Sequence, residues 1–130
     1  MPFSEQEVLD VLEGDFYPDN YLGVLQKTLL SLFYFTGIRR IELIELKFSS
    51  VDLEEGTLKV IGKRNKERLV PVLPSLLKRM KIFINDNPTN TYFFESKKRK
   101  KISPSTIYRV VTKYFRLVST KNKISPHVIR

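Results

Sequence analysis

The fold is decided by the stretch Ile61-Gly62-Lys63-Arg64-Asn65-Lys66-Glu67-Arg68-Leu69-Val70-Pro71. Apolar residues at its two ends enclose a polar, charged centre, a pattern typical of two antiparallel strands joined by a turn at residues 63–67. A further strand is expected before it at residues 48–53, which include Phe48, Val51 and Leu53 and are followed by the turn Glu54-Glu55-Gly56. We therefore expect a three-stranded antiparallel meander over residues 48–53, 57–61 and 68–73.

Around this meander, apolar residues recur at three- and four-residue spacing, which predicts helices. The expected helices cover residues 5–13, 19 or 20 to 35, 39–46, 74–84 and 104–118, and Gly37 is expected to close the second of them. With 130 residues, of which 42% are hydrophobic, the chain can pack one core and form one domain. The predicted fold class is α+β, a mainly helical domain with a three-stranded antiparallel sheet.

The chain is strongly basic, since 23 Lys and Arg residues against 14 Asp and Glu give a formal net charge of +9. This balance favours a polyanionic partner, either nucleic acid or an anionic membrane surface. The absence of cysteine excludes disulfides, and with a single histidine we expect no metal site and no cofactor. No apolar run reaches the roughly 18 residues of a membrane span. Residues 1–5 also lack the features of a signal peptide, so we expect a cytoplasmic, nucleoid-associated protein without a membrane partner.

Three segments carry side chains suited to a phosphate: Thr36-Gly37-Ile38-Arg39-Arg40-Ile41-Glu42-Leu43, the stretch quoted first, and Ser125-Pro126-His127-Val128-Ile129-Arg130. Breaking a phosphodiester requires positive charge at two non-bridging oxygens, a proton for the leaving oxygen and a nucleophile. Arg39 and Arg130 can bind the non-bridging oxygens. Ser125-Pro126 predicts a helix start that places His127 and Arg130 on one face, where the imidazole can transfer a proton or bond a phosphate oxygen.

Together and in this order, the three segments resemble the active-site segments of the tyrosine recombinases, the integrase family that includes the Xer proteins and the lambda-type phage integrases. The resemblance implies that Arg39, Lys63, His127 and Arg130 are catalytic and that Glu42 supports the site from behind. It also implies that Lys63 is the general acid for the 5′-hydroxyl leaving group. The implied reaction is site-specific DNA recombination or integration through a 3′-phosphotyrosyl intermediate, without metal or ATP.

Further basic residues are candidates for contacts to the DNA backbone beside this site. They are Arg40, Arg64, Lys66, Arg68, Lys97, Lys98, Arg99, Lys100 and Lys101. The competing interpretation of residues 97–101 is a solvated turn, and that of Glu42 is a helix partner for Arg39. Arg68 could also lie on the solvent face of its strand. In addition, Arg64 stands where Xer-type proteins commonly have glycine, which bears on the type of turn at the hairpin tip.

The resemblance covers essentially all of this chain but only part of a recombinase. Residues 1–130 are expected to form a partial catalytic domain that lacks the N-terminal core-binding domain and the C-terminal segment with the tyrosine nucleophile. All six tyrosines precede His127 and none matches the nucleophile, so the fragment alone is expected to be inactive. The expected partner is double-stranded DNA, bound by a homo-tetramer of the full-length protein. The alternatives are a non-catalytic DNA-binding module of the same fold and a type IB topoisomerase.

Overall fold

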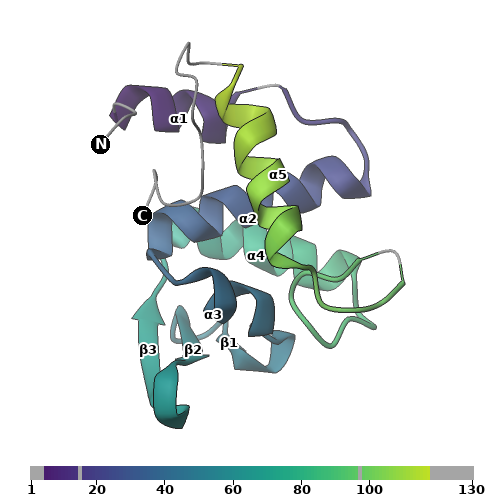
Figure 1. Cartoon of the computed structure of the whole chain (residues 1–130). Helices are drawn as coiled ribbons and strands as arrows, with labels where there is room; N and C mark the ends of the chain where they lie inside the picture. Colours follow the sequence, from purple (N-terminus) through teal and green to yellow (C-terminus); the bar gives the residue numbers. More distant parts are fainter. Residues whose placement is uncertain (1–4, 15, 97, 118–130) are drawn as a thin grey trace.

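The helices and strands follow the expected α+β order. The structure is a computed structural model that describes residues 5–14, 16–96 and 98–117. Its helices are α1 (Glu5–Glu13), α2 (Tyr21–Thr36), α3 (Arg40–Glu45), α4 (Pro74–Asp86) and α5 (Pro104–Phe115). Its antiparallel sheet has the order β1-β2-β3, formed by β1 (Val51–Asp52), β2 (Thr57–Ile61) and β3 (Glu67–Pro71). The sheet lies at one end of the molecule, with α3 between it and the longer helices (Figure 1).

The first strand is much shorter than the expected residues 48–53. Only Val51 and Asp52 pair with β2, while Phe48–Ser50 form a short 3-10 helix, η1. The Phe48 ring packs edge-on against Phe93, with ring centroids 5.2 Å apart, and the Phe48 N–H donates to the Thr91 carbonyl. These contacts turn the start of the segment toward the helical layer and away from β2. The third strand also ends earlier than expected, at Pro71, although the Val72 N–H still donates to the Gly56 carbonyl, and α4 begins at Pro74.

Helix α2 forms the centre of the helical layer and is contacted by α1, α4 and α5 (Figure 1). The side chain of Asn20 caps its first turn by accepting a hydrogen bond from the Gly23 N–H at 2.9 Å. Gly37 ends the helix in a left-handed conformation, with φ 67°, and its N–H donates to the Phe33 carbonyl. The confirmed closure at Gly37 turns the chain directly into the segment that carries Arg39.

An aromatic cluster fixes the loop between α4 and α5 against the end of α3. Phe83, Phe93 and Phe94 are fully buried and lie in ring contact with one another. Full burial of such a side chain contributes about 2 kcal/mol to folding. The Phe93 N–H also donates to the carbonyl of Leu46, at 2.7 Å, and Tyr92 forms a bridge with Lys47. The basic loop that follows is therefore held beside α3.

Within the part of the chain that the structure describes, no helix is long and apolar enough to cross a lipid bilayer.

Candidate active site

Arg39 lies immediately before the first residue of α3, at the N-cap position, with an extended backbone at φ −77° and ψ 158°. Its N–H donates to Oε1 of Glu42 at 2.7 Å, which is half of the reciprocal bonding found at capped helix starts. The residue as a whole is exposed, so its guanidinium is accessible to a ligand. The expected helix at residues 39–46 is confirmed as α3, which begins at Arg40.

Glu42 is the buried centre of the site, with 3% of its surface exposed. Besides the Arg39 N–H, its Oε1 accepts a hydrogen bond from Nη2 of Arg68 at 2.9 Å, which also makes an ion pair between α3 and β3. The second oxygen, Oε2, is buried and has no hydrogen-bond partner among the described residues. A side chain at Gly62 would place its Cβ 3.6 Å from this Oε2. The carboxylate therefore bonds the Arg39 segment and β3 and lies close to Gly62 at the base of the hairpin.

The hairpin tip that bears Lys63 is a tight turn at Lys63–Asn65, labelled η2. Arg64 and Asn65 both have positive φ, 60° and 57°, as in the turns that best match the twist of paired antiparallel strands. The Lys66 N–H donates to the Lys63 carbonyl at 3.3 Å, and the Gly62 N–H donates to the Lys66 carbonyl at 2.8 Å. Lys63, Arg64 and Lys66 are all exposed, so the turn presents three cations to solvent.

The described part of the basic loop, residues 98–101, is only partly free to meet a polyanion. Nζ of Lys101 donates to Oε1 of Glu45 on α3 at 2.7 Å, and this hydrogen bond raises the pKa of Lys101 above its ordinary value. Arg99 pairs with the buried Glu95, at 3.3 Å, and donates to the Thr89 carbonyl. Sequence reasoning did not identify Glu45 and Glu95. Glu45 closely follows the Arg39 segment, but its partner Lys101 lies 56 residues away, and Glu95 belongs to no motif.

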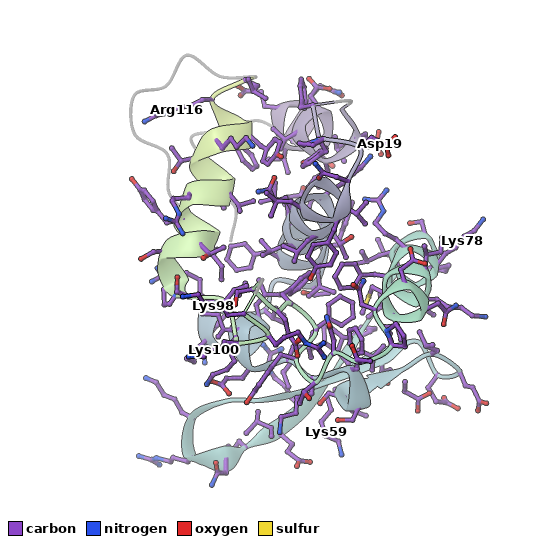
Figure 2. All side chains as sticks on the ribbon, turned by 90° about the vertical axis from the view of Figure 1, so that its right-hand side faces the viewer. Asp19, Lys59, Lys78, Lys98, Lys100 and Arg116 are labelled. Carbon is purple, nitrogen blue, oxygen red and sulfur yellow. The ribbon has the colours of Figure 1, made fainter. Side chains whose placement is uncertain are left out.

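The other two described cations of this loop, Lys98 and Lys100, are exposed. They lie toward the same side of the molecule as the turn between β2 and β3, whereas Lys78 projects from α4 on the opposite side (Figure 2). Arg40, also predicted to contact DNA, is the first residue of α3 and is half-buried. Lys97 lies outside the described residues.

The structure thus brings together two of the three segments that the sequence singled out. The remaining predicted catalytic residues, His127 and Arg130, lie outside the described residues, as does the helix start expected at Ser125. Arg68, predicted to contact DNA, directs its guanidinium to Glu42, and about half of its side chain is exposed. Among residues 5–14, 16–96 and 98–117, no three His, Cys, Asp or Glu side chains gather in a way that could hold a metal ion.

The amino-acid sequence of this chain is similar to those of known proteins. A family model described as "Phage integrase family" matches residues 3–130. Tyrosine recombinase XerD of Haemophilus ducreyi is 30% identical over 136 aligned residues, which cover 98% of this chain and 45% of that protein. Tyrosine recombinase XerC of Thermodesulfovibrio yellowstonii is 32% identical and covers 86% of this chain and 40% of that protein. The chain therefore spans less than half the length of these two relatives.

Solved structures share the fold of this chain. The crystal structure of XerA recombinase has a TM-score of 0.83 and 26% identity, and the match covers 98% of this chain and 46% of that chain. XerH site-specific recombinase in its pre-cleavage complex with difH has a TM-score of 0.84 at 21% identity, over 98% of this chain and 39% of that chain. At that identity the likeness concerns the fold. From the family match over nearly its whole length and the identity to the Xer proteins, the chain belongs to the phage integrase family, the family of the tyrosine recombinases.

Proposed function

We propose that this chain is part of the catalytic domain of a tyrosine recombinase that breaks and rejoins double-stranded DNA at specific sites. The observation that carries the proposal is the meeting of two motif segments at one carboxylate. Glu42 accepts the Arg39 N–H, and it faces Gly62, the residue before Lys63. The family match and the net charge of +9 support the same conclusion.

In the proposed reaction, a tyrosine of the full-length protein attacks the scissile phosphorus and the bond to the 5′-oxygen breaks. The products are a 3′-phosphotyrosyl bond and a free 5′-hydroxyl. Arg39 and Arg130 stabilise charge on the non-bridging oxygens, while the Lys63 ammonium gives its proton to the leaving 5′-oxygen. His127 bonds a phosphate oxygen or transfers a proton. A partner 5′-hydroxyl then attacks the phosphotyrosine and releases the tyrosine.

Double-stranded DNA is the proposed partner, bound along the side that carries the hairpin turn, Lys98 and Lys100. Two proteins with the same fold provide support: XerH is seen with its difH substrate, and a lambda integrase dimer with a COC′ core site. For the full-length protein we propose assembly as a homo-tetramer on DNA, at the nucleoid. The catalytic domain is proposed to act together with a core-binding domain and a segment that supplies the nucleophile.

The proposal is tested by Arg39→Ala and Lys63→Ala in the full-length protein. Each substitution removes a charge that acts on the phosphate, so we expect cleavage to slow by about 100-fold or more with the fold retained. Lys78→Ala, on the opposite side, is the matched control and should cleave at the normal rate. Cleavage is measured on a duplex with one recombination site, and folding by circular dichroism.

A second substrate isolates the role of the lysine. A 5′-bridging phosphorothiolate has a thiolate leaving group that needs no proton, so it should restore cleavage by Lys63→Ala but not by Arg39→Ala. Full activity of both variants on ordinary DNA would contradict the proposed site. DNA binding without cleavage by the unaltered protein would favour a non-catalytic DNA-binding module. Relaxation of supercoiled DNA without strand exchange would favour a type IB topoisomerase.

A further inference from the structure

We propose that Arg68 is a positioning residue, which fixes the β2–β3 hairpin against α3 through Glu42 and thereby places Lys63 relative to Arg39. The inference rests on the proposed function, in which Lys63 protonates the leaving oxygen. It assigns to Arg68 a role other than the phosphate contact that its sequence position suggests.

The register of the sheet directs Arg68 toward the helices. Side chains alternate between the two faces of a strand, and Arg68 lies two residues before Val70, which is buried against the core. Arg68 is also the register partner of the buried Val60 on β2. The opposite face carries Lys59, which points away from the helices (Figure 2). A cation on the inner face of β3 is placed to reach α3.

A single oxygen atom joins the two segments. Oε1 of Glu42 lies 2.9 Å from Nη2 of Arg68 and 2.7 Å from the backbone nitrogen of Arg39. If Arg68 moves and the Glu42 carboxylate moves with it, the hydrogen bond from the Arg39 N–H to that carboxylate changes as well. Arg39 is the residue proposed to bind the phosphate. The same carboxylate faces Gly62 through Oε2, next in sequence to Lys63. The positions of Arg39 and Lys63 are thus coupled through Glu42.

Electrostatics makes Arg68 necessary for this coupling. The Glu42 side chain is 1% exposed, and a buried carboxylate without a cation is strongly unfavourable. Arg68 supplies that cation at Oε1. Oε2 has no hydrogen-bond partner among the described residues, so it cannot compensate for the loss of Arg68. Without the guanidinium, the buried Glu42 carboxylate has no cation and must turn toward water, which releases the hairpin from α3.

The experiment compares Arg68→Met with Lys59→Met in the full-length protein. Both variants remove one positive charge from the same hairpin, but Lys59 pairs with the exposed Glu67, at 3.8 Å, on the outer face. Cleavage rates at saturating DNA should fall by about 10- to 100-fold for Arg68→Met, as expected for misplacement of a catalytic group, and stay unchanged for Lys59→Met. The affinity for DNA and its salt dependence should be the same in the two variants.

The 5′-bridging phosphorothiolate separates positioning from a loss of folding. If Arg68 acts by placing Lys63, this substrate should restore the part of the Arg68→Met rate that is lost in proton transfer, as it does for Lys63→Ala, and only the part lost through displacement of Arg39 should remain. Rescue of Lys63→Ala without rescue of Arg68→Met would overturn the inference and leave the proposed function standing. Failure to rescue Lys63→Ala would remove the proton donor, and the inference with it.

Two further variants cover the case in which Arg68→Met does not fold. Arg68→Lys keeps the cation but lacks the forked guanidinium, so it should show a smaller defect that the phosphorothiolate also repairs. Glu42→Gln combined with Arg68→Met leaves no unpaired buried charge, and the double variant should unfold at a higher temperature than Arg68→Met alone. Strictly additive effects of the two substitutions would show that Arg68 does not act through Glu42.

Discussion

The turn at the hairpin tip places an arginine where the backbone favours glycine. Arg64 has φ 60° and ψ 31°, and the next residue, Asn65, is also left-handed. Asparagine adopts this conformation readily, whereas arginine adopts it at a cost of about 1 kcal/mol. Strain of this kind is retained where the side chain has another use, and an exposed cation at the tip of the hairpin can contact DNA.

We expect Arg64→Gly to raise the free energy of unfolding by up to about 1 kcal/mol while weakening DNA binding. Arg64→Ala is the matched control, since it removes the same cation but keeps the Cβ in the left-handed region. Urea denaturation measures the stability of both variants, and fluorescence anisotropy measures their binding. Equal stability of the glycine and alanine variants would show that the turn is not strained.

Helix α3 has six residues, too few to be stable alone, and it is held from outside. Glu42 joins it to β3, and Glu45 joins it to Lys101 on the basic loop.

Gly37, in the left-handed conformation, turns the chain out of α2 toward α3. Apart from Gly37 itself and its two chain neighbours, no residue has an atom within 4 Å of where a Cβ at Gly37 would lie. A substitution at Gly37 therefore acts through backbone strain and not through a clash.

Gly37→Ala is expected to destabilise the domain by about 1 kcal/mol or more, and Gly37→Asn by less, because asparagine enters the left-handed region more readily. Urea unfolding of both variants provides the measurement. The altered exit from α2 should also displace Arg39, so cleavage by the full-length protein should fall in the same order. The opposite order of stability would contradict a left-handed closure of α2.

The elements show what could be predicted from this sequence and what could not. The helices and the hairpin follow from local periodicity, and the closure at Gly37 follows from backbone preference. The strand expected at residues 48–53 was wrong for its first half. Residues 48–50 form a 3-10 helix because the Phe48 ring packs against Phe93, which lies far along the chain. Pairing of Arg68 with Glu42 across 26 residues, and of Lys101 with Glu45 across 56, likewise depends on tertiary contact.

On the scale of the whole molecule, the positive charge on the side of the hairpin turn should dominate DNA binding. We expect Lys98→Glu with Lys100→Glu to weaken binding strongly and to reduce the slope of log affinity against log salt by about 0.9 for each phosphate that is no longer neutralised. Lys78→Glu with Lys81→Glu changes the net charge equally on α4 and should have a smaller effect. Anisotropy titrations with a short duplex between about 50 and 200 mM salt measure both slopes. Equal weakening by the two pairs would mean that only net charge matters.

Among the described residues, the two outer edges of the sheet are unpaired, which bears on how copies would contact one another in the proposed assembly on DNA. An unpaired strand edge offers its backbone to any other strand and is a common start of aggregation. Here one edge, β1, has only two residues, and the other, β3, carries Glu67, Arg68 and Pro71. Charge and a proline without an N–H oppose the addition of a further strand. The sheet edges therefore disfavour association of copies through added strands.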